Sequence, residues 1–586
     1  MEQFTNFVNK LADIVWNAGI PIGQDRFPFV VLALLGTGVF LTLRLGFVQI
    51  RRFGHGVAVT TGRYDDPDEP GDVSHFQALS TALSATVGIG NIAGVAIAIH
   101  WGGPGALFWM WVTAALGMAI KYTEVTLAQK YRVVTGPDHD AKKWEGTVSG
   151  GPMYYIERGL GPKWKPLAMF FALMLGLTAF LTGNGIQANT MADTMEASFG
   201  LNPVITGAVS AMLVAVVILG GITRIGKVSG ILAPMMAVVY VAGAMLIILM
   251  NLGQVIPTFG LIFREAFNPT AGVAGTGVGA ILITMMWGVK RGLFSNESGQ
   301  GSAPIAHAAA KTDEPVSEGV VALLEPFIDT IMICSMTGLV VIMTGAHSEK
   351  LPTQLTLTGG DLSYVAQQDN GRYRPVPPLP EIIVEDGHPV NTQAPEVPSL
   401  AWHDAPVETL YTDPAMQTPF TGVIRTGAGV AVTETGQELR SLYGLAPETG
   451  APMTMNAFRK GLAPLGDWGH YIVVISVMLF ALSTAISWSY YGDRCFNYLA
   501  GRQAILPYRL VYVVMHFVGA VLPLTVAWTL GDVFLGIVIL PNLLALWMLS
   551  GDVARESDSY FERKPWLKNV EKQKQAKERE RQVSGS

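Results

Sequence analysis

Long apolar runs separated by short polar loops occupy most of the chain. A helix of about 20 mostly apolar residues is long enough to cross a lipid bilayer. The runs therefore predict an all-α integral membrane protein with about eleven transmembrane helices. The predicted spans are residues 27–45, 76–99, 106–129, 164–186, 204–222, 231–250, 273–289, 320–344, 471–491, 505–528 and 533–549.

Three segments do not fit the pattern of membrane spans. Residues 1–26 carry apolar side chains at helical spacing from Phe4 to Val15, which predicts an amphipathic helix at the membrane interface. Residues 347–466 are polar and proline-rich with short β-like runs, so we expect a small exterior β-rich insert. Residues 551–586 are highly charged without an apolar stripe and predict a cytoplasmic, partly disordered tail.

The predicted span 76–99 is interrupted in its middle. Its centre, from Ser84 to Asn91, reads SATVGIGN, and two glycines followed by asparagine favour a helix poorly. An interrupted helix leaves backbone N–H and C=O groups unpaired, and within a membrane these must meet protein, a cavity or a ligand. We interpret the break as a binding site; the alternative is a kink filled by packing against a neighbouring helix.

A second interrupted helix is predicted in the later part of the chain. The apolar run that begins at Val278 continues for only about a dozen residues, shorter than a full span. Gly288 and Gly292 interrupt the residues that follow it. We therefore expect a second break at Trp287 and Gly288.

The two predicted breaks divide the chain into similar halves. With an extra helix at residues 27–48 set aside, the remaining spans form two groups of about five, residues 76–250 and residues 273–346 with 467–550, of opposite orientation. Inverted repeats that each begin with a broken helix favour a secondary transporter. The helix before a break presents carbonyls to a cation and the helix after it presents N–H groups to an anion. A zwitterionic amino acid with a metal ion suits both ends.

Composition and charge agree with a membrane protein. Apolar residues make up 50% of the chain and charged residues 14%, whereas soluble domains carry about 25% charged residues. Arg51, Arg52 and Arg63 follow the first span, so this loop is predicted to be cytoplasmic, with the N-terminus outside and the C-terminus in the cytoplasm. The expected partners are a lipid bilayer, here a bacterial plasma membrane, and a small solute; nucleic acid is not expected.

The motifs of other protein classes are missing from the sequence. There is no G-x-S-x-G elbow, no H-E-x-x-H metal motif and no Walker-type phosphate loop. The segment GTGVG from Gly275 to Gly279 lies within an apolar run and does not predict a dinucleotide site. The chain is therefore not expected to be an enzyme or an ATP-driven pump, and a channel remains the alternative to a transporter.

Four long motifs follow one another along the chain. They read SATVGIGNIAGVAIAIHWGGPGALFWMWVTAALGMAIKYTEVTLAQKYR, GGPMYYIERGLG, GVKRGLFSNESGQGSAPIAHAAA and FALSTAISWSYYGDRC. Together they resemble the alanine or glycine:cation symporter family, also called sodium:alanine symporters. The resemblance implies the inverted-repeat fold of the leucine-transporter type with an additional helix, and uptake of alanine or glycine with sodium as the co-transported ion. Proton coupling is the alternative. The insert departs from typical members, which have a short connection there.

The resemblance also implies roles for residues of the first break. Gly88, Ile89 and Gly90 match the unwound segment of sodium-coupled amino-acid transporters, where backbone N–H groups bind the substrate carboxylate. Thr86 and Asn91 would supply oxygen atoms to the substrate. For Asn91, capping of the second half-helix is the alternative.

Ser483 and Thr484 are the candidate sodium ligands of the ninth span. Hydroxyl and carbonyl oxygens suit a hard cation, and by analogy with the fold the carbonyls of Ser84 and Val87 would complete the site. Adjacent hydroxyls in membrane helices also bond back to the preceding turn, which is the alternative.

Four further residues are candidates for binding the substrate. Trp488 follows Thr484 by one helical turn, so its indole can close over a small side chain. Gln187 offers both a donor and an acceptor. Trp287 and Gly288, at the expected second break, would release carbonyls toward the substrate ammonium, and Met285 and Met286 would be adaptable walls. Packing or capping is the alternative for each.

Two carboxylates one helical turn apart, Glu325 and Asp329, lie near the start of the eighth span. Ionisable residues at membrane depth are functional candidates. Because Lys290, Arg291 and Lys311 are close in the predicted topology, we expect a structural or gating ion pair.

Overall fold

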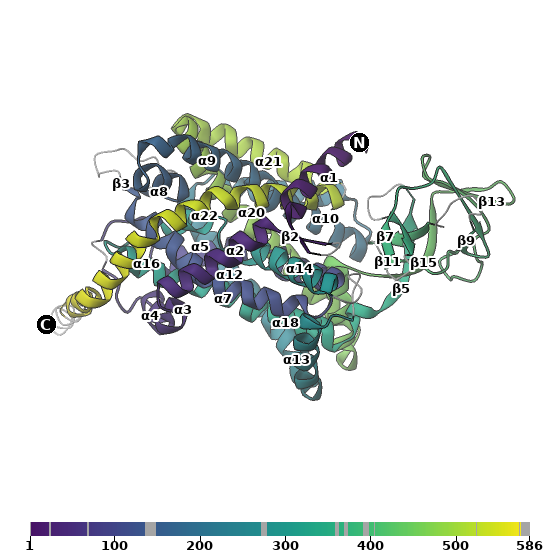
Figure 1. Cartoon of the computed structure of the whole chain (residues 1–586), viewed down its shortest axis with the longest axis horizontal. Helices are drawn as coiled ribbons and strands as arrows, with labels where there is room; N and C mark the ends of the chain where they lie inside the picture. The colour runs from purple at the N-terminus through teal and green to yellow at the C-terminus, as the bar shows by residue number, and fades with distance from the viewer. Residues whose placement is uncertain are drawn as a thin grey trace.

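The structure is a computed structural model that describes residues 2–22, 25–66, 69–134, 148–270, 278–357, 362–367, 373–390, 398–403, 405–522, 524–573 and 575. Most of its elements are helices, as the apolar runs predict. The strands β5 to β15 gather at one end of the helical body, and the C-terminus lies at the opposite end (Figure 1).

The helices follow the apolar runs closely. In chain order they are α1 (Glu2–Asn17), α2 (Phe29–Arg44), α3 (Val48–Arg51), α4 (Phe53–Thr60), α5 (His75–Thr86), α6 (Ala93–Gly102), α7 (Ala106–Lys130), α8 (Pro152–Gly159), α9 (Lys165–Phe180), α10 (Ile186–Phe199), α11 (Pro203–Ile218), α12 (Ile222–Met250), α13 (Leu252–Phe267), α14 (Val278–Asn296), α15 (Ala303–His307), α16 (Pro315–Ala322), α17 (Leu324–Pro326), α18 (Ser335–Met343), α19 (Gly450–Gly461), α20 (Gly469–Ala500), α21 (Ile505–Val521) and α22 (Leu524–Arg563). Two π-helical segments, η3 (Leu181–Gly185) and η4 (Phe327–Cys334), continue α9 into α10 and α17 into α18.

Several helices have the length and apolarity of membrane spans. In the described part of the chain, six continuous helical stretches qualify: residues 162–199, 224–250, 315–343, 469–500, 502–521 and 528–563. The pair α5 and α6 adds a seventh span if its two halves are counted together. The helices α2 and α11 are apolar but shorter.

The first predicted break is present. Helix α5 ends at Thr86, a single 3-10 turn, η1 (Ile89–Asn91), follows, and α6 begins at Ala93. The two halves are bent by 60°. The glycine-containing GIGN segment therefore interrupts the helix where the sequence predicts it.

The second predicted break is wrong in its position. Helix α14 runs without interruption from Val278 to Asn296, through Trp287, Gly288 and Gly292; the apolar residues before Val278, at 273–277, lie outside the described residues. Its glycines serve close packing instead, because a Cβ atom on Gly288 would lie 2.5 Å from the carbonyl oxygen of Ala106 in α7. The helix ends only after Asn296, where a turn with two glycines at positive φ, Gly299 (φ 89°) and Gly301 (φ 79°), precedes α15.

The strands lie between η5 (Ala346–Ser348) and α19. Their bounds are β5 (Lys350–Thr356), β6 (Leu362–Gln367), β7 (Tyr373–Pro375), β8 (Glu381–Glu385), β9 (His388–Pro389), β10 (Ser399–Trp402), β11 (Ala405–Pro406), β12 (Gly422–Arg425), β13 (Val430–Thr433), β14 (Glu438–Leu439) and β15 (Ser441–Pro447). They form antiparallel sheets in the orders β11-β10-β6-β7 and β14-β13-β12-β8-β9, and β5 pairs with β15. Two short hairpins lie elsewhere, β1 (Gly19–Ile22) with β2 (Asp25–Pro28) and β3 (Val133–Val134) with β4 (Val148–Ser149).

Helix α19 lies within the range expected for the insert, yet it belongs to the helical body. Thr454 Oγ1 donates a hydrogen bond of 3.1 Å to the carbonyl of Ile92, at the start of α6. Phe458 on the same helix packs against Tyr240 of α12. The strand-forming part of the insert therefore ends before α19.

The C-terminal segment is docked rather than disordered over its described residues. Helix α22 continues to Arg563, whose guanidinium pairs with Glu314 at 2.8 and 2.9 Å. Residues 566–573 form further helical turns, and the Trp566 ring lies 4.5 Å from the His55 ring in α4. Burial and the neighbouring Arg52 lower the pKa of His55 to about 4, so this ring is neutral and packs as an aromatic group. Residues 574 and 576–586 lie outside the described residues.

Candidate functional site

The backbone of the break is held by two side-chain amides. The N–H of Gly88 donates to Asn91 Oδ1 at 2.9 Å, and the N–H of Ile89 donates to Gln187 Oε1 at 3.4 Å. Gln187, at the start of α10, is itself fixed because its Nε2 donates to the carbonyl of Thr182 at 3.2 Å. The structure thus brings together Gly88, Ile89, Asn91 and Gln187, four of the residues predicted to bind the substrate.

Small residues are required at the break because neighbouring elements approach it closely. A Cβ atom on Gly88 would lie 2.5 Å from Thr484 Oγ1 and 3.3 Å from Gln187 Oε1. A Cβ atom on Gly90 would lie 3.0 Å from the ring of Phe294 in α14. The break is therefore enclosed by α10, α14 and α20.

Asn91 is anchored to a buried carboxylate on η4. Its Nδ2 donates to Asp329 Oδ1 at 2.6 Å and to the Asp329 carbonyl at 3.1 Å. The other carboxylate oxygen of Asp329 accepts from Ser295 and Thr330, each at 2.7 Å. Asn91 therefore links the break to a fixed acidic group. It does not cap α6, whose N-cap residue is Ile92 and which has no side-chain cap bond.

Four serine and threonine side chains gather around the end of α5. Ser483 Oγ donates to the carbonyl of Ser84 at 3.0 Å and lies 2.5 Å from Ser84 Oγ. Thr484 Oγ1 donates to the same carbonyl at 3.4 Å, and Ser487 Oγ donates to Ser84 Oγ at 2.9 Å. Neutral oxygens of this kind suit a hard monovalent cation, since hard cations prefer oxygen ligands.

The remaining predicted residues of the first break have different surroundings. Val87 leaves the helical conformation (φ −74°, ψ 84°), so its carbonyl no longer follows the axis of α5. Thr86 donates to the carbonyl of Ala82 at 3.1 Å, so its hydroxyl is bonded back to its own helix. This is the alternative behaviour that hydroxyls show inside helices.

Trp488 and Trp287 lie in different places. The Trp488 indole, which is buried, packs on Gly183 of η3 and donates to Glu297. Trp287 stacks on Trp101 of α6 with ring centroids 5.6 Å apart and lines a separate cavity. The expected pocket formed by Trp488 with Met285, Met286 and Trp287 is therefore not the arrangement found.

That cavity has a volume of about 390 Å³ and separates the helical body from the strands. Its lining includes Trp101, Trp287, Lys290, Arg291, Trp402, His403, Trp528 and Asp532. Trp528 also stacks on Phe294 with ring centroids 5.1 Å apart. Phe294 in turn approaches Gly90, so this aromatic pair connects the cavity wall to the break.

The strand segment contributes one wall of the cavity. Its His403 carbonyl accepts a hydrogen bond of 2.9 Å from His100 Nε2, at the end of α6. Burial, with a smaller effect of His100, lowers the pKa of His403 to about 3, so this imidazole is neutral at neutral pH. The bond from His100 to the His403 carbonyl therefore docks the strand segment on the end of α6.

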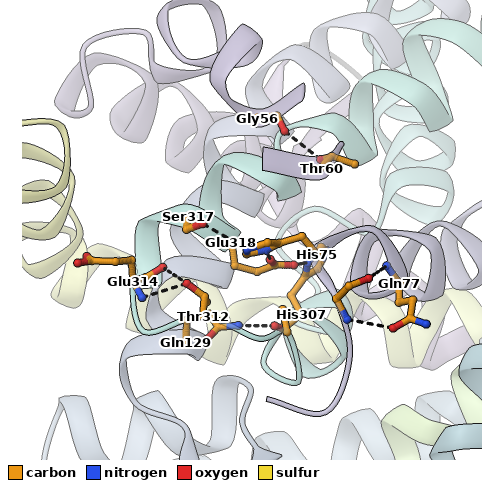
Figure 2. A network of polar contacts seen from close by, with 12 residues as sticks. Gly56, Thr60, His75, Gln77, Gln129, His307, Thr312, Glu314, Ser317 and Glu318 are labelled. Carbon is orange, nitrogen blue, oxygen red and sulfur yellow. Dashed lines mark hydrogen bonds and ion pairs between the residues drawn. The ribbon is translucent and has the colours of Figure 1, made fainter. Parts of the chain in front are cut away.

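A row of buried ionisable side chains leads from Glu325 to the start of α5. His75 and His307 converge on the Glu318 carboxylate (Figure 2), with His307 Nδ1 2.5 Å from Glu318 Oε1. His307 Nε2 also contacts Glu325, and Lys121 Nζ lies 3.0 Å from Glu325 Oε2. The row joins α5 to α7, α15 and α16.

The prediction that Glu325 and Asp329 pair with Lys290 or Arg291 is wrong. Lys290 and Arg291 each lie 2.7 Å from Asp532 Oδ2 instead. Glu325 pairs with Lys121 and His307, while Asp329 accepts only from neutral donors among its described contacts.

Two residues of the site are missing from the prediction. Ser487 follows Ser483 by one helical turn, so its position was detectable from helical spacing. Glu297 stands in the quoted motif NESGQGS but carries no local signal of its contact with Trp488, because that contact joins segments far apart in sequence.

Comparison with known proteins gives consistent matches over nearly the whole chain. A family profile described as "Sodium:alanine symporter family" matches residues 1–367 and 394–577. "Sodium/alanine symporter AgcS" of Methanococcus maripaludis is 39% identical over 572 residues, covering 97% of this chain and 100% of that protein. "Putative sodium/proton-dependent alanine carrier protein YrbD" of Bacillus subtilis is 32% identical, covering 93% and 90%. "Probable sodium/glutamine symporter GlnT" of the same organism is 27% identical, covering 96% and 92%.

Proposed function

Because this chain belongs to the sodium:alanine symporter family, we propose that it carries alanine or glycine into the cell together with sodium ions. Membership makes it a multi-pass membrane transporter rather than an enzyme. The choice of amino acid and of coupling ion is our proposal.

One observation supports this proposal more than any other. The Thr484 hydroxyl is shared between the two predicted sites, because it donates to the Ser84 carbonyl and also faces Gly88 of the break. A sodium ion held by the oxygens of Ser84, Val87, Ser483 and Thr484 would fix the end of α5. Fixing α5 orders the N–H groups of Gly88, Ile89 and Gly90, which we propose bind the substrate carboxylate. Gly88 and Ile89 would exchange their bonds to Asn91 and Gln187 for bonds to the substrate.

The proposed mechanism is alternating access in an inverted-repeat fold of about eleven spans, with the N-terminus outside and the C-terminus in the cytoplasm. The cavity of about 390 Å³ would be the outer access route, closed from the break by Phe294 and Trp528. The row from His75 to Glu325 would hold α5 in place on the cytoplasmic side.

Uptake of radiolabelled alanine into proteoliposomes tests the proposal. We expect saturable uptake that requires an inward sodium gradient and that glycine inhibits. Uptake that follows a pH gradient in the absence of sodium would favour a proton symporter. Flux that neither saturates nor responds to a sodium gradient would favour a channel.

A further inference from the structure

Glu297 is the first residue after α14, at the true end of that helix. It is buried (3% exposed) and has a left-handed backbone with φ 57°. Residues other than glycine rarely adopt this conformation, and such strain persists only where the surroundings enforce it. The surroundings of Glu297 must therefore hold this buried acidic side chain in place.

The contacts of the Glu297 carboxylate supply that explanation. Its Oε1 accepts a hydrogen bond of 2.9 Å from Trp488 Nε1, and its Oε2 accepts from the Ser302 hydroxyl. Ser302 lies across the same turn, so the carboxylate is anchored at one oxygen and holds the indole with the other. Within the described residues, Trp488 and Ser302 are the two side chains that donate hydrogen bonds to it.

Trp488 lies next to the proposed substrate site. It follows Thr484, which approaches Gly88, by one turn of α20. Its ring packs closely on η3, because a Cβ atom on Gly183 would be 2.3 Å from the indole Cγ. The neighbouring Thr182 carbonyl fixes Gln187, which in turn holds the N–H of Ile89.

An indole held only by packing on a glycine can rotate about its side-chain bonds, whereas a hydrogen bond to its N–H fixes its direction. The geometry points to Glu297 as a positioning residue: we propose that it fixes the Trp488 indole and so sets the largest substrate side chain that fits beside the break. This inference rests on the proposed function, because it assumes an amino-acid substrate at Gly88 to Asn91.

The test compares Glu297→Gln with Glu297→Leu. Glutamine keeps an oxygen that can accept from the indole, and its backbone strain is comparable, whereas leucine of similar volume cannot accept. Radiolabelled alanine uptake is measured with valine and leucine as competitors. We expect Glu297→Leu to lower the leucine concentration for half-inhibition about tenfold with a smaller change for alanine itself, and Glu297→Gln to remain close to the parent.

A double-mutant cycle separates positioning from a general structural effect. Trp488→Phe lacks the indole N–H, so it should relax the exclusion of leucine by itself, and adding Glu297→Leu should change it little further. Equal relaxation by Glu297→Gln and Glu297→Leu would overturn the inference, as would additive effects in the double variant. If the Glu297→Leu protein does not insert into the membrane, the Trp488→Phe variant tests the inference alone. The inference is overturned if Trp488→Phe excludes leucine as strongly as the parent does. Absence of sodium-dependent alanine uptake in the parent protein would instead refute the proposed function.

Discussion

A single methyl group is enough to disturb the break between α5 and α6. Gly88 has φ −127° and ψ −157°, a conformation open to alanine, so its requirement for glycine is purely steric. The obstacle is the Thr484 hydroxyl, 2.5 Å from the added Cβ atom.

We therefore expect Gly88→Ala to reduce alanine uptake at low substrate concentration by about tenfold or more, since overpacking costs about 1–3 kcal/mol. Uptake per inserted protein is the measurement. Gly88→Ala combined with Thr484→Ala removes the obstructing oxygen and should recover the thermal stability lost in the single variant. A single variant with normal uptake and stability would contradict the close approach.

Thr484→Ala should raise the sodium concentration for half-maximal uptake. Loss of a hydroxyl that faces a charged group costs about 1.5–3 kcal/mol, which corresponds to about tenfold or more in affinity. Thr484→Ser retains the oxygen and serves as the control. Unchanged sodium dependence in Thr484→Ala would remove Thr484 from the proposed sodium site.

At this scale the sequence was informative where chemistry follows local spacing. Ser483 and Thr484 are adjacent on one helix, so spacing alone identifies them as a pair. Their approach to Ser84 is predicted only by analogy with the fold. The partners of Glu325 were not predicted, because Lys121 and His307 come from segments whose mutual position only the folded structure defines.

Helix α14 shows that glycine in a membrane helix has two different uses. In α5–α6 glycines permit a break, whereas in α14 Gly288 and Gly292 allow close contact with α7. Sequence composition is the same in both cases, so glycine alone could not separate a break from a packing surface. Helix α14 ends only after Asn296, at a turn rich in polar residues.

Gly288→Ala should lower the thermal stability of the detergent-solubilised protein by several degrees. The added Cβ atom would lie 2.5 Å from the Ala106 carbonyl oxygen and 2.6 Å from Trp109 Cβ, and overpacking of this kind costs about 1–3 kcal/mol. The matched control is Gly260→Ala in α13, where an added Cβ atom meets nothing within 4 Å. Equal melting temperatures for the two variants would show that α14 and α7 are not tightly packed.

For the whole molecule, apolar runs predict a mostly helical protein, because membrane burial leaves a long and simple signal. In the described residues, six helices have the length and apolarity of a span, or seven with the pair α5 and α6, against the eleven spans predicted. The apolar runs did not predict α13 or α4, which are shorter and carry no span-length run. The position of the strands against the membrane helices, with the cavity between, could not be inferred, since it depends on contacts such as His100 with His403.

Residues 351–447 should be removable with partial retention of transport. Lys350 and Pro447 are paired neighbours at the ends of β5 and β15, so a bridge of about three Gly or Ser residues can join Lys350 to Glu448, the residue after the deletion. The longer deletion 351–455 also removes the start of α19 and the bond from Thr454 to Ile92, so its sodium-dependent uptake should be much lower. Complete loss of uptake by a correctly inserted 351–447 deletion would instead make the strands part of the transport cycle.

The C-terminal segment should protect the loop before α5 from proteolysis. Asn569 donates to the Tyr64 carbonyl at 3.1 Å and Gln573 donates to the Asp65 carbonyl at 2.7 Å. Trp566→Ala removes the ring beside His55, so we expect tryptic cleavage after Arg63 to become several times faster.

Lys572→Gln is the control for this experiment. It changes the exposed Lys572, which pairs with Asp66, but leaves the Trp566 ring in place, so cleavage should stay close to the parent rate. Cleavage at equal rates in Trp566→Ala and the parent would show that the segment is not held in solution.

The π-helical segments η3 and η4 have a consequence for the history of the family. A π-helical turn arises when a helix gains one residue, and such insertions persist mainly at functional positions. Each residue of an α-helix turns the chain by about 100°. One inserted residue therefore rotates all side chains after it about the helix axis, relative to the side chains before it. Gln187 follows η3 and Asp329 lies within η4, and these are the residues that reach the break from two sides. Relatives that lack the inserted residue before Gln187 should therefore have lost its bond to Ile89 and diverged in what they carry.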